Sequence, residues 1–144
     1  MKNLLFIPCY NDEKSLRKLL IEIGNLYQSS FDILIINDGS DQELYFSKKN
    51  KSLKIINLKH NYGIGFCLKF AIKYALKNDY KKFCRIDSDG EHHPKYIKDI
   101  FKMLDVNDFI LGDRKILFKQ SYFKIASKKT INLIINKLFG LKID

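Results

Sequence analysis

Short apolar runs rich in branched side chains recur along this chain, and most are separated by segments with helical periodicity. The runs occupy residues 4–7, 33–36, 53–56, 83–86 and 109–111. Runs of this length and composition are typical of buried β-strands. Strands that alternate with helices predict an α/β fold, in which helices cover both faces of a mostly parallel sheet.

Three of the intervening segments have the apolar spacing of amphipathic helices. Residues 16–27 place their apolar side chains in one stripe, and Asn11 or Asp12 is available as the N-cap. A second pattern spans residues 64–76. A third starts at Pro94, because proline is favoured in the first turn of a helix.

The length and cysteine content set the expected class of protein. A chain of 144 residues fits a single domain, residues 1–144, and is long enough to bury a core. No stretch approaches the roughly 18 apolar residues of a membrane span, and the first apolar run is too short for a signal peptide. We therefore expect a cytoplasmic protein.

Cys9, Cys67 and Cys84 lie far apart without C-x-x-C spacing, which indicates packed thiols.

The strongly basic charge restricts the choice of partner. A formal net charge of +10 favours nucleic acid, a phosphate-bearing ligand or acidic lipid headgroups. The lysines are spread along the chain, with no arginine and aromatic cluster and no recognisable nucleic-acid module. Nucleic acid is therefore disfavoured as the partner.

Polar clusters follow the predicted strands, where ligands bind in parallel α/β sheets. They occupy residues 8–12, 37–41, 60–65, 85–94 and 112–114. Taken alone, the cluster at 8–12 could be a turn that leads into a helix, the cluster at 37–41 is equally well explained as a tight turn, and Arg114 could be a surface arginine. The prediction of a site therefore rests on their combination. Gly63 and Gly65 let backbone approach a ligand, but the third glycine of a dinucleotide fingerprint is missing, which argues against a nicotinamide or flavin site. Asp38 presents a carboxylate able to accept hydrogen bonds from a base or ribose.

Two carboxylates at the end of the fourth strand are the most specific signal. Asp87 and Asp89 lie two residues apart, and their mutual repulsion costs stability unless a cation neutralises them. Oxygen ligands favour Mg²⁺ or Mn²⁺ bridging to a diphosphate. His92 and His93 keep zinc open as an alternative, although surface or loop packing is the expected role of each.

These clusters, in this order and spacing, resemble the family 2 glycosyltransferases of the GT-A fold, especially the branch of dolichol-phosphate mannose synthase. Residues 7–12 resemble the family's P-x-Y-N-E segment, and residues 36–40 resemble D-D-G-S. Residues 61–65 are similar to N-x-G-x-G, residues 87–94 to the metal loop D-x-D-G-Q-H-x-P, and residues 112–114 to G-S-R. The resemblance covers residues 4–144 and implies a Rossmann-like GT-A fold.

Three positions depart from the family pattern. Asp12 stands where glutamate is usual, and Asn37 replaces the first aspartate of D-D-G-S. Glu91 replaces the glutamine of the metal loop and adds a negative charge there. Asp38, which usually meets the nucleoside in this family, is kept.

The resemblance implies a metal-dependent, inverting transfer of sugar from a nucleoside-diphosphate sugar to a lipid-phosphate or saccharide acceptor, as in polysaccharide and cell-envelope synthesis. The implied metal ligands are Asp87, Asp89 and Glu91, holding Mn²⁺ or Mg²⁺, and the implied catalytic residues are Asp89 and Asp144. The implied nucleotide-sugar-binding residues are Pro8, Tyr10, Asp12, Asp38, Gly63, Gly65, Asp87, Ser88 and Arg114.

The last stretch of the sequence raises a separate question. Residues 121–139 are expected to be helical, but apolar side chains surround this helix and lysines are interspersed. It is expected to pack on the sheet or further polypeptide, to self-associate, or to lie at the inner face of an anionic membrane. Asp144 resembles the first aspartate of the family's D-x-x-S-G-[FY]-R segment, so the domain is expected to be incomplete at its acceptor side.

Two other function classes remain open from the sequence. A nucleotidyltransferase shares the sheet and the paired aspartates, but releases pyrophosphate instead of a nucleoside diphosphate. A non-catalytic donor-binding remnant of an interrupted glycosyltransferase is the second alternative.

Overall fold

The computed structural model describes residues 2–27, 30–46 and 52–112. The chain divides into Met1–Ile110, which contains every helix and strand below, and Leu111–Asp144. Arg114, Asp144 and the helix expected over residues 121–139 lie outside the described residues. A single domain over residues 1–144 therefore stays a prediction.

Four parallel strands form the sheet, and the first strand lies inside it. They are β1 (Asn3–Cys9), β2 (Asp32–Asn37), β3 (Leu53–Asn57) and β4 (Lys82–Arg85), in the order β3-β2-β1-β4. The chain moves outward from β1 to β3 and then returns to the other side of β1. The strand order therefore reverses between β1 and β4, and in open parallel sheets ligands bind beside such a reversal.

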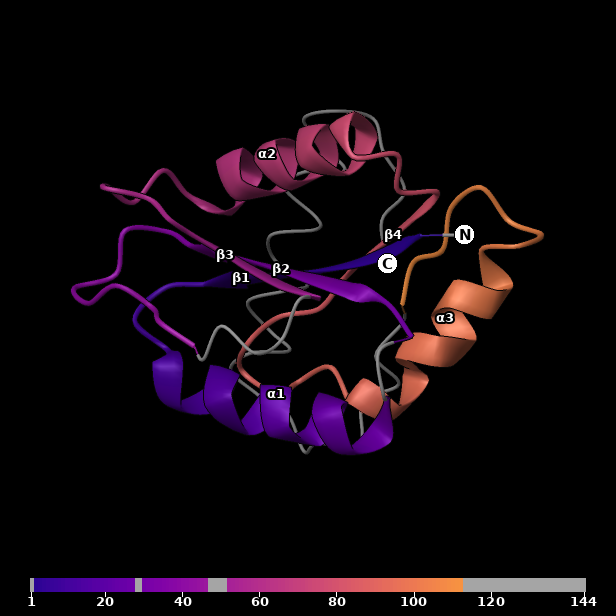
Figure 1. Cartoon of the computed structure of the whole chain (residues 1–144), viewed down its shortest axis with the longest axis horizontal. Helices are drawn as coiled ribbons and strands as arrows, with labels where there is room; N and C mark the ends of the chain where they lie inside the picture. Colours follow the sequence, from indigo (N-terminus) through magenta and orange to yellow (C-terminus); the bar gives the residue numbers. More distant parts are fainter. Residues whose placement is uncertain (1, 28–29, 47–51, 113–144) are drawn as a thin grey trace, which may run out of the picture. The chain divides into compact units, whose positions relative to one another are not determined.

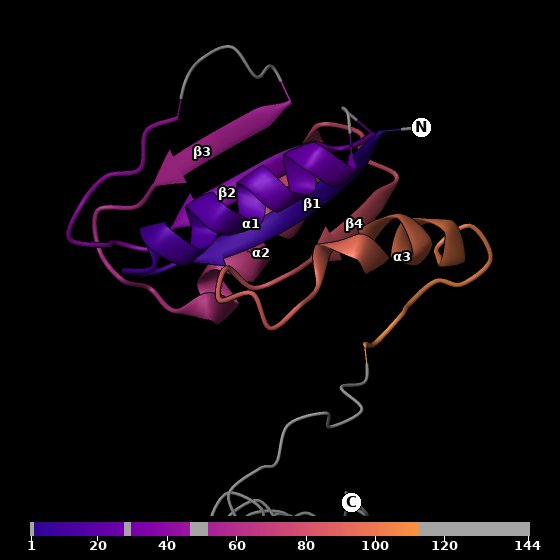
Figure 2. The same cartoon turned by 90° about the horizontal axis from the view of Figure 1, so that it is seen from below.

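The helices cover both faces of this sheet, as the sequence predicts (Figures 1 and 2). On one face lies α2 (Ile64–Lys77). On the other lie α1 (Glu13–Leu26) and α3 (Ile97–Met103), which follows a single 3₁₀ turn, η1 (Pro94–Tyr96). The α/β fold class is confirmed.

Alternation along β1 builds a core on each side of the sheet. Leu5 and Ile7 pack with α1 and α3, whereas Leu4 and Phe6 pack with α2. All four side chains are fully buried. Burying an aliphatic or aromatic side chain of this size stabilises the fold by about 1.5 to 3 kcal/mol. β1 is thus held by a core on both of its sides.

The predicted fifth strand, residues 109–111, is wrong. These residues form no strand, and Phe109 and Leu111 are exposed. Three apolar residues meet the composition of a strand, but a strand is stable only when its backbone pairs with a neighbour and its side chains are covered. Neither condition is met here within the described residues.

The start of the third helix differs in detail from the expectation. Pro94 does open a helical segment, but as the 3₁₀ turn η1 that leads into α3. The Tyr27 hydroxyl, at the end of α1, lies 2.9 Å from the carbonyl oxygen of Pro94 and 2.7 Å from that of Lys95. This contact ties α1 to η1.

No helix in the described ranges is long and apolar enough to cross a membrane.

Candidate functional site

A hollow of about 300 Å³ lies at the carboxyl ends of β1, β2 and β4, beside the first turn of α2. Its volume is at the lower end of the range for small-molecule sites. It adjoins the point where the strand order reverses. Seven predicted site residues line it: Pro8, Tyr10, Asp38, Gly63, Asp87, Ser88 and Asp89.

Asp38 links the end of β2 to the start of α2. Its side chain is buried, and its two carboxylate oxygens accept hydrogen bonds from the backbone N–H groups of Tyr62 (2.8 Å) and Gly63 (2.9 Å). Its own amide donates to the carbonyl of Cys9 at the end of β1 (2.8 Å). Asp38 therefore joins three of the segments that surround the hollow. Each carboxylate oxygen has a second lone pair, so these bonds do not exhaust its capacity to accept.

Gly39 permits a close approach between two of these segments. Its φ is +68°, and a Cβ added there would lie 2.2 Å from the carbonyl carbon of His60 and 2.4 Å from the amide nitrogen of Asn61. Both obstructing atoms are backbone atoms, which cannot rotate away. Glycine is therefore required where the loop after β2 meets the loop before α2.

Asn37 organises the loop after β2 from inside the protein. Its side-chain nitrogen donates to the carbonyl of Gln42 (3.0 Å) and to Oδ1 of Asn57 (2.9 Å), and its Oδ1 accepts from the hydroxyl of Ser40. Ser40 Oγ in turn accepts from the amide of Asn11 (2.8 Å). An aspartate here would lack both N–H donors. This network gives a structural reason for asparagine at position 37.

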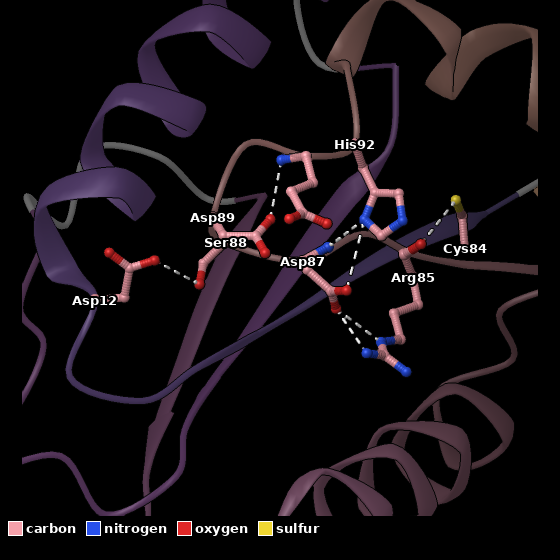
Figure 3. A network of polar contacts seen from close by, with 8 residues as sticks. Asp12, Cys84, Arg85, Asp87, Ser88, Asp89 and His92 are labelled. Carbon is pink, nitrogen blue, oxygen red and sulfur yellow. Dashed lines mark hydrogen bonds and ion pairs between the residues drawn. The ribbon is translucent and has the colours of Figure 1, made fainter. Parts of the chain in front are cut away.

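Asp87 is paired with a cation of the protein (Figure 3). Its Oδ1 accepts from Arg85, at 2.7 Å from Nη2 and 3.1 Å from Nε. The Asp87 amide donates to Nδ1 of His92 (3.1 Å). The same Nδ1 lies 3.6 Å from Asp87 Oδ2, a contact that becomes an ion pair only if His92 is protonated. Arg85 therefore gives Asp87 a positively charged partner within the protein.

Asp89 and Ser88 have local partners in the same loop. Asp89 Oδ1 accepts from the amide of Glu91 (2.9 Å) across Gly90, which has a φ of +78°. The hydroxyl of Ser88, which is buried, donates to Oδ2 of Asp12 (3.2 Å). The Asp12 side chain makes no cap hydrogen bond to α1, although Asp12 is the N-cap residue. Its carboxylate instead connects the loop after β1 to the loop after β4.

Three predicted site residues do not line the hollow. Asp12 contacts it through Ser88, Gly65 lies in the first turn of α2, and the exposed Glu91 meets Asp89 through its backbone. Arg114 and Asp144 fall outside the described residues. The roles of all these residues stay predictions.

Two of the three predicted metal ligands, Asp87 and Asp89, line the hollow, and Glu91 does not. Asp87 and Asp89 provide carboxylate oxygens, which Mg²⁺ and Mn²⁺ prefer. Within the described ranges, no group of three or more His, Cys, Asp and Glu side chains could hold a metal ion. Mg²⁺ is commonly held by one or two carboxylates together with substrate phosphates, which this pair of aspartates fits.

The remaining residues of the lining, which the sequence did not single out as binding residues, are Cys9, Asn61, Ile64 and Cys67. The three cysteines are free and buried, as expected of packed thiols. Burial, followed by the nearby charge of Asp38, raises the pKa of Cys67 to about 12, so its thiol is a poor nucleophile. Cys67 lies four residues after Gly63, and this helical spacing was the available signal that it faces the same site.

The sequence can also be placed among known proteins. A model of the family described as Glycosyl transferase family 2 matches residues 5–142, which is nearly the whole chain. The chain belongs to glycosyl transferase family 2. The residues around the hollow are therefore those of a glycosyltransferase domain.

Relatives in this family include proteins with named reactions. The chain is 27% identical over 148 residues to an uncharacterized glycosyltransferase of Synechocystis sp., covering 96% of this chain and 46% of the relative. It is 28% identical to a UDP-N-acetylglucosamine–dolichyl-phosphate N-acetylglucosaminyltransferase of Methanococcus voltae, covering 76% and 51%. It is 29% identical to a poly-beta-1,6-N-acetyl-D-glucosamine synthase of Staphylococcus epidermidis, covering 80% and 29%. The chain spans about half the length of the first of these relatives.

A solved structure shares the fold. TarS residues 1–349 of S. aureus in complex with UDP superposes with a TM-score of 0.56 and 22% identity, covering 86% of this chain and 40% of TarS 1–349. The GT-A fold of this family 2 domain is thereby confirmed.

Proposed function

We propose that this family 2 domain binds a nucleoside-diphosphate sugar in the hollow and transfers its sugar, with inversion and with Mn²⁺ or Mg²⁺, to a lipid-phosphate or saccharide acceptor. The observation that carries the proposal is the convergence of Asp38, Asp87 and Asp89 on one hollow at the reversal of strand order. Such a reversal is where nucleotides bind in open parallel sheets.

The described residues divide the work of holding the donor. Asp38 would accept a hydrogen bond from the nucleoside with a lone pair not used by Tyr62 and Gly63. Asp87 and Asp89 would hold the metal, which when bound stabilises the negative charge of the departing diphosphate. Ser88, fixed by Asp12, lies between the two aspartates and would help to orient the donor there.

The transfer forms a bond between an acceptor oxygen and the anomeric carbon and breaks the bond from that carbon to the diphosphate oxygen. The electron pair leaves with the nucleoside diphosphate. A lipid phosphate attacks without losing a proton, because its second ionisation lies near pH 6. A sugar hydroxyl must lose its proton, and Asp144 is the proposed base.

The relatives support both acceptor classes. One has dolichyl phosphate in its name, and another is a polysaccharide synthase. UDP in the TarS complex supports a nucleoside diphosphate as ligand, and makes UDP the first nucleotide to test.

A thermal-shift panel of nucleoside diphosphates, with adenosine monophosphate as a control and each ligand measured with Mn²⁺ and with EDTA, tests the proposal on this chain. A ligand present at 100 times its Kd stabilises the folded state by about 2.7 kcal/mol whether or not the protein turns over. We expect UDP with Mn²⁺ to give the largest shift and adenosine monophosphate the smallest. No shift with any nucleoside diphosphate in either condition would refute the proposed donor site.

Product analysis separates the proposed function from its alternatives. Release of nucleoside diphosphate on transfer is expected of the glycosyltransferase. Release of pyrophosphate would identify a nucleotidyltransferase, and tight UDP binding without any turnover would identify a donor-binding remnant.

A further inference from the structure

The solvent side of α2 combines apolar side chains with lysines. These exposed residues, here called the α2 outer face, are Phe66, Lys69, Ile72, Lys73, Leu76 and Lys77. Successive members are mainly three or four residues apart, so they share one side of the helix. That side lies opposite Cys67, Ala71 and Ala75, which pack on the sheet. Leu76 is 71% exposed, which leaves its apolar surface available for contact.

The charge of α2 distinguishes it from the other two α-helices of the described part. α2 contains three lysines and no acidic residue. In α1 the basic residues are accompanied by Glu13 and Glu22, and Arg17 is paired with Glu13. α3 contains Asp99. The α2 outer face therefore carries its positive charge uncompensated within the helix, beside exposed apolar groups.

We propose that the α2 outer face docks this chain on an anionic lipid surface. A bilayer interface with acidic headgroups complements both properties of the face, because lysines approach the headgroups while apolar side chains enter the acyl boundary. Tyr62, stacked on Phe66 with ring centroids 4.7 Å apart, adds an amphipathic aromatic group of the kind enriched at such interfaces.

Docking in this way brings the donor site close to the bilayer. Gly63 and Ile64, at the start of α2, line the hollow, and Tyr62 and Phe66 lie at the same end of the helix. The consequence for the proposed function is a preference for a lipid-linked acceptor, since its phosphate lies among the headgroups. Docking itself rests only on the composition of the face, and not on nucleotide binding.

Co-sedimentation of the full chain with vesicles tests the inference. The vesicles are phosphatidylcholine alone, or phosphatidylcholine mixed with phosphatidylserine. We expect binding to the mixed vesicles only, weakened by salt. Replacing Lys69, Lys73 and Lys77 by glutamine should lower the partition coefficient about 100-fold, at about fivefold per lysine. Leu76→Ser with Ile72→Ser should lower it about tenfold or more, because the apolar contact is lost.

A matched control uses α1, where Lys14→Gln, Arg17→Gln and Lys18→Gln remove the same number of positive charges from another exposed helix. This control should bind vesicles within about threefold of the wild type, since scattered surface charge acts weakly at a distance. Circular dichroism and the thermal unfolding midpoint without ligand, recorded for every variant, verify that each is folded, and the UDP shift is recorded separately.

Several results would overturn the inference. One is that the wild type does not bind the mixed vesicles. Another is that the α2 variants bind them as tightly as the wild type, and a third is that the α1 and α2 variants lose vesicle binding equally. Sedimentation velocity showing a wild-type dimer that Leu76→Ser dissociates would also overturn it, in favour of a second copy on this face. Vesicle binding without a UDP shift would instead refute the proposed donor site and leave the docking face intact.

Discussion

The acidic residues of the hollow are held in two different ways. Asp38 is only 5% exposed and is bound by backbone N–H groups whose positions are fixed by the fold. The Asp87 side chain is 26% exposed and pairs with a flexible arginine, while Asp89 accepts from a neighbouring amide in its own loop. A buried, backbone-held carboxylate is costly to alter, whereas an exposed pair can exchange its partner. The position of Asp38 is therefore fixed when the chain folds, whereas Asp87 and Asp89 can exchange their partners when a ligand binds.

Gly39→Ala should produce the largest effect, because it separates the loops that Asp38 joins. The new Cβ would meet backbone at 2.2 Å in a left-handed conformation. We expect a loss of about 3 kcal/mol or more in the free energy of unfolding, measured by urea denaturation. Gly90→Ala is the control, since Gly90 has a φ of +78° but no atom within 4 Å of the added Cβ. It should cost only about 1 to 2 kcal/mol. Equal losses in the two variants would show that the close approach is unimportant.

Asp38→Asn should affect both stability and binding. The side-chain amide would turn a donor toward one of the N–H groups of Tyr62 and Gly63, so that this partly buried N–H group loses its carboxylate acceptor. We expect about 2 to 3 kcal/mol of lost stability, and UDP affinity in EDTA reduced about tenfold or more. If calorimetry showed that the variant binds UDP with the wild-type affinity, Asp38 would serve only to hold the loop.

Asp87→Asn and Asp89→Asn should show the opposite pattern. Each removes one of two neighbouring carboxylates and so relieves repulsion, while Asp87→Asn also loses a partly exposed ion pair with Arg85. Stability should therefore stay within about 1 kcal/mol of the wild type. Each should abolish the increase in UDP affinity that Mn²⁺ produces, measured by calorimetry. Asp41 is an exposed acidic residue of the loop after β2 and does not line the hollow. Asp41→Asn should therefore keep the Mn²⁺-dependent increase in UDP affinity. If both Asp87→Asn and Asp89→Asn kept the Mn²⁺-dependent increase in UDP affinity, the metal would not bind at this site.

Arg85→Gln should give the smallest effect. In the wild type a metal that binds Oδ1 of Asp87 competes with the guanidinium of Arg85. The pair is partly exposed, and such pairs contribute about 0.2 to 1 kcal/mol. We therefore expect Mn²⁺ to bind about two- to fivefold more tightly to the variant, measured by the electron paramagnetic resonance of free Mn²⁺. Unchanged or weaker Mn²⁺ binding would mean that Arg85 does not compete with the metal.

Elements with strong periodicity could be predicted from the sequence. The four strands and three helices of the described part follow from buried runs and apolar stripes, and the site follows from the rule that ligands bind at strand ends. Residues 109–111 show the limit, because their composition contains no information on whether a partner strand exists. The sequence predicts that Cys67 and Cys84 are both buried. That prediction alone does not distinguish Cys67, which lines the hollow, from Cys84, which packs in the core.

The partners of the site residues were the least predictable part. Asp38 and Asp87 are both acidic residues after strands, and nothing in the sequence separates the one bound by backbone from the one bound by Arg85. That distinction depends on which loops the fold brings together, since Tyr62 and Gly63 lie 24 and 25 residues from Asp38. Asn37 is a similar case, because its partner Asn57 lies on a different strand.

An NMR titration of the ¹⁵N-labelled chain with UDP and Mg²⁺ tests the central claim most directly, which is that the nucleotide binds at the reversal of strand order. We expect the largest shifts in the amides of Tyr10, Tyr62, Gly63, Ser88 and Asp89, with replacement of Mg²⁺ by Mn²⁺ broadening those of Ser88 and Asp89. A second hollow of about 140 Å³ lies at residues that include Tyr27, Phe31 and Phe46. Shifts confined to that hollow, or no localised shifts, would contradict the account.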